Sequence, residues 1–102
     1  MMWTFCSFDL PTKKEIEKQY YTRFRKHLMR CGFFMLQYSV YVKYSDCEES
    51  DRTAREEVKR ELPPVGAVRI YSMTDAQYER MGSYRRGEVV ELEKPIPQLQ
   101  LF

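Results

Sequence analysis

The stretch MWTFCSFDLPT, residues 2–12, decides the fold because it joins a buried strand to a basic helix. Met2 to Phe8 is apolar and aromatic and has the length of a β-strand. Asp9 follows at the carboxyl end of this strand, and a Pro-Thr pair then opens the helix. Thr12 is the predicted N-cap, since Glu15 three residues later completes a capping box.

The predicted helix continues to Cys31 and has one apolar side and one basic side. Its apolar residues recur every three or four positions and form a single stripe of Ile16, Tyr20, Phe24, Leu28 and Cys31. On the face roughly opposite this stripe we expect Lys14, Lys18 and Arg25, and on its flanks Arg23, Lys26 and Arg30. Gly32 should end the helix, because glycine adopts the left-handed conformation without a side-chain penalty.

The middle of the chain predicts strands on either side of a second helix. Residues 33–43 are rich in aromatic and β-branched residues and form two short strands, or one strand bent near residues 37–39. Residues 45–61 form a polar helix that the following Pro-Pro pair stops. Residues 65–73 form a clear strand.

The last part of the chain predicts a short helix and an exposed strand. Thr74 and Gln77 form a capping box for a helix that ends near Gly82. Residues 83–87 indicate a basic turn or loop, and residues 88–93 alternate polar and apolar as an exposed or edge strand does. Two prolines make residues 94–102 a non-helical tail, so the predicted domain covers residues 1–93.

This order of elements predicts an α+β domain of the ferredoxin-like βαββαβ type, with a short extra helix and an appended C-terminal strand. Both main helices would cover one face of an antiparallel sheet and leave the other face bare. The residues expected to line that face or the core are Phe5, Val40, Val42, Val68 and Ile70. A small, aromatic-rich domain with an uncovered sheet face is expected to form a homodimer through it.

Composition narrows the class of protein. A chain of 102 residues forms one domain, and no apolar run approaches the ~20 residues of a membrane span. The N-terminus does not have the pattern of a signal peptide. Three widely spaced cysteines argue against a disulfide framework and a zinc site, and they favour a reducing cytoplasm.

The net charge of +2 hides two regions of opposite sign. Residues 13–31 hold seven Lys or Arg against two Glu, whereas residues 46–61 hold seven acidic against four basic residues. One face should therefore be positive and another negative. The positive helix predicts phosphate contacts, or else a solvated helix face. Arg85 and Arg86 would add phosphate contacts or simply solubilise their loop.

Asp9 is the leading candidate for chemistry. A carboxylate at a strand end beside a basic helix suits Mg²⁺, which takes oxygen ligands and commonly only one or two carboxylates. A homodimer would bring two copies of Asp9 together. The alternative is a turn residue before proline, or a charge that stabilises the helix start. His27 is interpreted as structural, and Ser39 has no partner that would make it a nucleophile.

The chain resembles the Cas2 family of CRISPR-associated proteins, the small non-integrase subunit of the spacer-acquisition complex. The residues that carry the resemblance lie in three blocks at the right separations, which are Phe8–Thr12, Gly32–Tyr41 and Val68–Gln77. These blocks are most similar to the branch found in type II systems. Met35 stands where family members often have an arginine.

The resemblance implies a ferredoxin-like homodimer whose last strand crosses to the partner. It implies that Asp9 is the metal ligand and catalytic residue of a Mg²⁺-dependent endonuclease that cleaves single-stranded RNA or duplex DNA. In spacer acquisition the dimer would bridge integrase dimers and support the duplex pre-spacer. We therefore expect a scaffold first, an endonuclease second, and an unrelated ferredoxin-like RNA-binding module third.

Overall fold

The computed structural model describes residues 1–93 of the chain, so the predicted tail over residues 94–102 lies outside the described residues. The elements follow in the order β1 (Met2–Asp9), α1 (Glu15–Arg30), β2 (Phe34–Gln37), β3 (Val40–Ser45), α2 (Glu48–Lys59), β4 (Ala67–Thr74), α3 (Asp75–Glu79), β5 (Tyr84–Arg85) and β6 (Glu88–Val89).

The main sheet is antiparallel and has the strand order β2-β3-β1-β4. β1 therefore lies in the middle, where both of its edges are paired: Phe5 faces Val42 on β3 and Tyr71 on β4. This order, with the two crossover helices on one face, is the ferredoxin-like α+β arrangement, which confirms the predicted fold class. Of the two interpretations of residues 33–43, the one with two short strands is correct.

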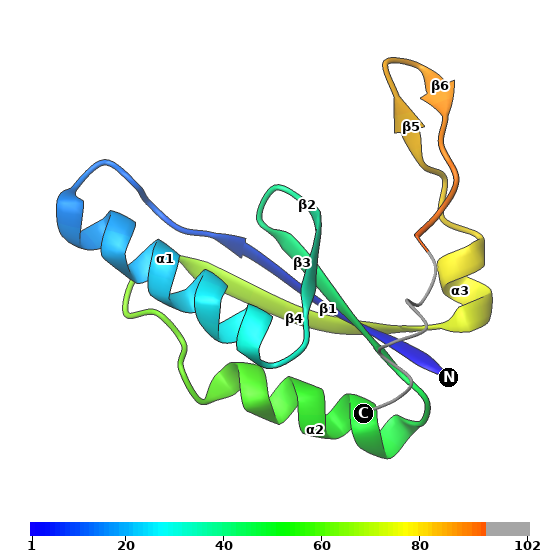
Figure 1. The fold of residues 1–102 in the computed structure, drawn as a ribbon, viewed down its shortest axis with the longest axis horizontal. Helices are drawn as coiled ribbons and strands as arrows, with labels where there is room; N and C mark the ends of the chain where they lie inside the picture. Colours follow the sequence, from blue (N-terminus) through cyan, green and yellow to red (C-terminus); the bar gives the residue numbers. More distant parts are fainter. Residues whose placement is uncertain (94–102) are drawn as a thin grey trace.

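The main core lies between the sheet and the helices α1 and α2, which cover the same face (Figure 1). It joins Cys6 and Phe8 of β1 to Phe24 and Leu28 of α1 and Val58 of α2. Burial of such side chains contributes about 1.5–3 kcal/mol each. Because successive residues of a strand point to opposite faces, the even-numbered residues of β1 face the helices.

Polar contacts also hold the helices to the core. The buried Asp51 of α2 accepts hydrogen bonds from the hydroxyls of Thr4 on β1 and Ser72 on β4. His27 of α1 is buried, with Nδ1 2.7 Å from the Glu61 carboxylate and Nε2 2.7 Å from the backbone oxygen of Glu57. His27 thus joins α1 to the end of α2, which agrees with its structural interpretation.

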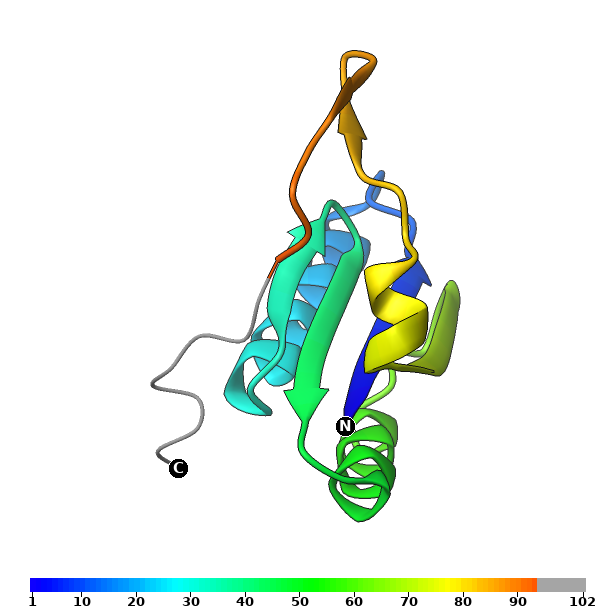
Figure 2. The same cartoon turned by 90° about the vertical axis from the view of Figure 1, so that its right-hand side faces the viewer.

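The second sheet face is only partly open, so the prediction of a bare face is wrong. α3 packs over one end of it (Figure 2), where Tyr78 stacks on Trp3 at a centroid distance of 4.0 Å. Trp3, Phe5, Val42 and Tyr78 form a second buried cluster. The sequence could not show this cover, because a five-residue helix gives no periodic pattern that says which face it meets.

The five predicted lining residues divide between the two faces. Val68 and Ile70 pack against the main core under the helices. Phe5, Val40 and Val42 belong to the second face. The strand alternation sends odd-numbered β1 residues and even-numbered β3 residues to the same side, since Phe5 pairs with Val42.

The start of α1 differs from the prediction. The helix begins at Glu15 with Lys14 as its N-cap, so Thr12 is not the N-cap. Glu17, rather than Glu15, reaches back and accepts the backbone N–H of Lys14 at 2.9 Å. The capping pair is therefore displaced by two residues, and Ile16, expected in the apolar stripe, is 46% exposed on the first turn. Gly32 follows the helix with φ +92°, as expected of a residue that ends it.

The C-terminal part of the described chain forms a hairpin that projects away from the main sheet (Figure 1). Residues 83–87, expected as a turn or loop, contain β5, which pairs with β6 through Tyr84–Val89 and Arg85–Glu88. Arg86 and Gly87 both have positive φ, as a tight two-residue hairpin turn requires. The predicted strand over residues 88–93 is therefore only Glu88–Val89, and within the described residues it does not join the main sheet.

All three cysteines are free. Cys6 is fully buried, and burial raises its thiol pKa to about 12, so it stays a neutral core residue. Burial, followed by the charge of Glu57, also raises the pKa of the Cys31 thiol. In residues 1–93, none of the helices has the length and apolar character needed to cross a membrane.

Candidate metal and nucleic-acid sites

Asp9 is the last residue of β1 and its side chain is exposed. It pairs with Ala67 at the first residue of β4. Gly66, just before β4, lies so close that a Cβ on it would be 2.5 Å from the backbone oxygen of Asp9. The backbones of Gly66 and Asp9 therefore approach each other closely at the end of the strand. This contact holds the backbone of Asp9 in place and so sets the position from which its side chain extends.

Asp9 is the carboxylate that a single chain places at the end of β1. Within residues 1–93 no group of three or more His, Cys, Asp or Glu side chains is placed to hold a metal ion. Asp9 alone still fits the donor chemistry of Mg²⁺, whose remaining positions water and phosphate oxygens commonly fill.

Three polar side chains share the sheet face of Asp9. Ser7 is two residues earlier on β1. On β4, Arg69 is opposite Ser7 and Tyr71 is opposite Phe5. The Ser7 Oγ and the Tyr71 hydroxyl oxygen are 2.6 Å apart. These three residues were not among the predicted site residues. The sequence pattern that could have indicated Arg69 and Tyr71 is the polar–apolar alternation of β4. In this alternation the two residues flank the apolar Ile70 and so share the other face of the strand.

Met35 does not lie beside Asp9 within one chain. Its neighbours Phe34 and Leu36 pack against the second-face cluster, so Met35 points to the helix side of β2 and is 55% exposed. Asp9 is on the opposite face, two residues from Ser7. The absence of an arginine at position 35 therefore removes no neighbour of Asp9 from the same chain.

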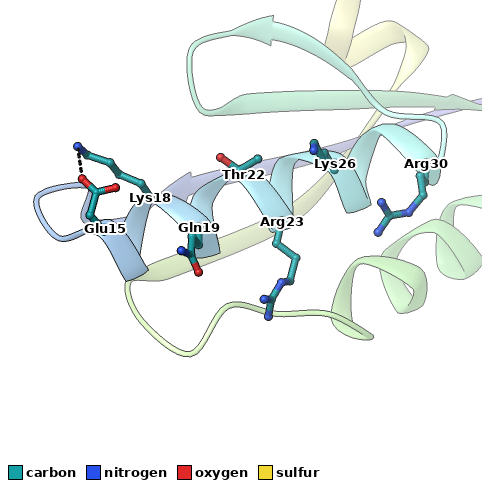
Figure 3. Close-up of a pocket in the computed structure, with 7 residues that line it drawn as sticks. All are labelled: Glu15, Lys18, Gln19, Thr22, Arg23, Lys26 and Arg30. Carbon is teal, nitrogen blue, oxygen red and sulfur yellow. Dashed lines mark hydrogen bonds and ion pairs between the residues drawn. The ribbon is translucent and has the colours of Figure 1, made fainter.

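Four of the predicted cations lie along the exposed surface of α1. Lys18, Arg23, Lys26 and Arg30 line a shallow, solvent-facing concavity together with Glu15, Gln19 and Thr22 (Figure 3). We call Lys18, Arg23, Lys26 and Arg30 the basic face of α1. Lys18 pairs with Glu15 at 3.3 Å and Arg30 with Glu61 at 3.4 Å, both at exposed positions.

These ion pairs leave the basic face available to an anion. Exposed pairs contribute only about 0–1 kcal/mol, so a phosphate can compete with both carboxylates. Arg23 and Lys26 take part in none of the ion pairs found within residues 1–93. The basic face therefore has the charge and exposure of a phosphate-contacting surface.

The other predicted cations lie elsewhere. Arg25 is not opposite the apolar stripe, because its Nε donates a 2.9 Å hydrogen bond to the hydroxyl of Tyr41 on β3. Lys14 caps the helix start. Arg85 and Arg86 sit at the tip of the β5–β6 hairpin, at the opposite end of the molecule from the start of α1 (Figure 1). The structure thus brings together four of the eight predicted nucleic-acid contacts.

Fold and site together define a ferredoxin-like domain with an exposed carboxylate at the end of its central strand and a basic helix on the other side of the sheet. The sequence profile of the family described as CRISPR associated protein Cas2 matches residues 2–81. The chain belongs to this family, as its sequence motifs predicted.

Several relatives are similar over nearly the whole chain. A protein of Flavobacterium psychrophilum is 33% identical over 99% of this chain and 88% of its own length. A protein of Paracidovorax avenae is 35% identical over 100% of this chain and 94% of its own. A protein of Parvibaculum lavamentivorans is 36% identical over 99% of this chain and 100% of its own. Each of these relatives is named a CRISPR-associated endoribonuclease Cas2.

Proposed function

We propose that the protein is a CRISPR adaptation subunit, a cytoplasmic homodimeric scaffold that binds nucleic acid and bridges integrase dimers during spacer acquisition. The observation that carries this proposal is the separation of two surfaces. The basic face lies on α1, in the helix layer, whereas the partly open face with Tyr71 lies on the other side of the sheet. A dimer formed through the sheet would leave both copies of the basic face free for a duplex pre-spacer.

The protein should be a dimer in solution. Tyr71 is 37% exposed on the second face, where only one end is covered by α3. Size-exclusion chromatography with light scattering should give twice the chain mass of 12.4 kDa at micromolar concentration. Tyr71→Glu should weaken the dimer because it buries a charge, while Tyr38→Glu, at a tyrosine 75% exposed, should not. A wild-type mass of one chain would contradict the proposal.

Reversing charge on the basic face should weaken binding of duplex DNA. Each phosphate contact releases counterions, so Arg23→Glu with Lys26→Glu should lower the affinity about tenfold or more. The slope of log affinity against log salt concentration should also become shallower, by the equivalent of about two phosphate contacts. The loss should be equal for different sequences, because phosphate contacts carry no base information. Fluorescence anisotropy across a salt series measures both quantities.

The matched control reverses two exposed arginines of the α2 region, Arg52→Glu with Arg60→Glu. This control changes the net charge of the chain by the same amount. If both double variants lose affinity equally, net charge and not the basic face governs binding. If neither loses affinity, the nucleic-acid surface lies elsewhere on the protein.

Co-expression with a CRISPR integrase from the same organism tests the scaffold role itself. A tagged wild-type protein should recover the integrase and capture a labelled duplex. The Arg23→Glu/Lys26→Glu variant should still recover the integrase but capture much less duplex. A wild-type protein that recovers no integrase would refute the scaffold role.

A Mg²⁺-dependent endonuclease acting on single-stranded RNA or duplex DNA is the second candidate function. Two observations favour it, namely the exposed carboxylate of Asp9 at the end of β1 and the endoribonuclease names of the relatives. Asp9 from each copy would hold the metal. When bound, Mg²⁺ would polarise a phosphoryl oxygen and assist the attack of water. Family membership leaves the third expectation, an unrelated RNA-binding module, without support.

A further inference from the structure

We propose that Tyr38, supported by Tyr21 and flanked by Arg25, forms a platform on which an unpaired base of a single-stranded nucleic acid stacks. This inference rests on the proposed nucleic-acid function and adds a class of ligand to it. A base inside a duplex is covered by its neighbours, whereas a base of a single strand offers a free ring face. The tyrosine ring would take that face, and the guanidinium would take a phosphate beside it.

Tyr38 presents an open ring at the tip of a turn. It is the first residue of the two-residue turn between β2 and β3, since Gln37 pairs with Val40. Its ring lies on that of Tyr21 of α1, with centroids 6.0 Å apart and an interplanar angle of 22°, which is in the range of offset stacking. Because Tyr38 is 75% exposed, the ring face turned away from Tyr21 is open to a ligand.

The support beneath Tyr38 is fixed by the core and by the end of β1. Tyr21 packs against the main core, where its ring meets that of Phe8 edge to face at 5.6 Å. The backbone N–H of Phe8 donates a 3.0 Å hydrogen bond to the backbone oxygen of Ser39, the second residue of the turn. Ser39 has φ +62°, a conformation unfavourable for a residue with a Cβ, so tertiary contacts hold this turn in place. A platform that is already ordered loses little freedom when a base binds.

Two cations flank the aromatic pair along α1. Arg25 is four residues after Tyr21 and Lys18 three residues before it, so both lie on neighbouring turns of the same helix face. Arg25 uses its Nε on a tyrosine hydroxyl of β3 and takes part in none of the ion pairs found in the described part of the chain, so its other N–H groups can contact a phosphate. Lys18 also belongs to the basic face, so a strand bound along that face would continue toward Tyr38. A charged track with stacking rings is the usual way in which proteins bind single strands.

The platform is on the side of the sheet that the proposed homodimer leaves free. Tyr38 stacks on Tyr21, and Tyr21 packs against the core under the helices. The cluster on the second face contains neither of these tyrosines. A dimer formed through the second face would therefore keep one open platform in each copy.

The experiment measures binding of fluorescein-labelled single-stranded RNA, single-stranded DNA and duplex DNA to the full-length protein by anisotropy, with EDTA present to prevent metal-dependent cleavage. Tyr38→Ala should weaken binding of both single strands about tenfold, which is the usual cost of losing one stacked base. Tyr38→Phe keeps the ring and should bind like wild type. Tyr38→Leu keeps an apolar cover over Tyr21 but has no flat ring, so it should lose as much as Tyr38→Ala. Tyr84→Ala, at a tyrosine 67% exposed on the β5–β6 hairpin, is the matched control and should be neutral.

Duplex DNA and salt separate stacking from charge. Affinity for the duplex should change less than about twofold in Tyr38→Ala, because paired bases offer no free face. The slope of log affinity against log salt concentration should stay that of wild type in Tyr38→Ala, whereas Arg25→Ala should make it shallower by about one phosphate contact.

Three results would count against the platform. Tyr38→Ala that binds single strands like wild type, or that loses equal affinity for single strands and duplex, would overturn the inference while the nucleic-acid function stands. A wild-type protein that binds duplex DNA but no single strand would do the same. A wild-type protein that binds none of the three probes would refute both the inference and the nucleic-acid function. Circular dichroism of Tyr38→Ala should match wild type, because the residue is exposed.

Discussion

Asp9→Asn should abolish metal-dependent cleavage of RNA, lowering the rate about 100-fold or more. Altering the neighbours of a metal ligand alone costs roughly 10–100-fold, and this substitution removes the charge of the carboxylate that would itself hold the metal. The variant should remain folded, because Asp9 is exposed and surface substitutions change stability by only about 0.5 kcal/mol. A discontinuous assay with labelled RNA, with and without Mg²⁺, measures the loss.

The same variant separates the two candidate functions. If the protein acts as a scaffold, Asp9→Asn should still dimerise, recover the integrase and capture the pre-spacer. Asp46→Asn, at another exposed carboxylate, is the matched control and should retain every activity. Loss of spacer acquisition by an Asp9→Asn protein that still dimerises and binds the integrase would overturn the scaffold proposal. Cleavage that survives in Asp9→Asn would place the nuclease centre elsewhere, or in a contaminant.

Gly66→Ala should lower the free energy of unfolding by about 2–5 kcal/mol. Two costs add here, because a residue with a Cβ loses about 1–2 kcal/mol in the left-handed conformation and overpacking costs another 1–3 kcal/mol. Gly66 has φ +82°, and its new methyl group would meet the backbone oxygen of Asp9 at 2.5 Å and the Leu10 side chain at 2.6 Å. Urea unfolding followed by circular dichroism measures the change.

Gly87→Ala is the control that divides these two costs. Gly87 has the same φ of +82°, but nothing lies within 4 Å of the position that a Cβ would occupy there. It should therefore show the conformational cost of about 1–2 kcal/mol without the clash. Similar losses in both variants would mean that the contact of Gly66 with Asp9 and Leu10 relaxes freely. The difference between the variants measures how firmly the end of β1 is held.

The sequence was sufficient for features that depend on local pattern. The apolar run before Asp9, the capping box of Thr74 and Gln77, and the glycine after α1 each act over a few neighbouring residues. The order of elements then allowed one familiar arrangement of strands and helices, and the motifs identified the family. Asp9 at the end of β1 belongs to this group, because its place depends only on where the strand stops.

Capping and helix faces show where local pattern becomes ambiguous. Thr12 with Glu15 and Lys14 with Glu17 are both possible ends for the same helix, and the structure has the second. Likewise, spacing alone placed Arg25 opposite the core. The hydroxyl of Tyr41, sixteen residues away on β3, gives that guanidinium a partner beside the sheet instead.

Only the tertiary structure decided which residues surround Asp9. Arg69 and Tyr71 are about sixty residues from it in the chain, and a shift of one residue in the register of β4 would turn both toward the helices. That register is set by burial of Val68 and Ile70 and by the hydrogen bonds from Ser72 to Asp51. Strand existence is a local property, whereas register is a property of the whole packed sheet, so the neighbours of the carboxylate could not be derived from the sequence alone.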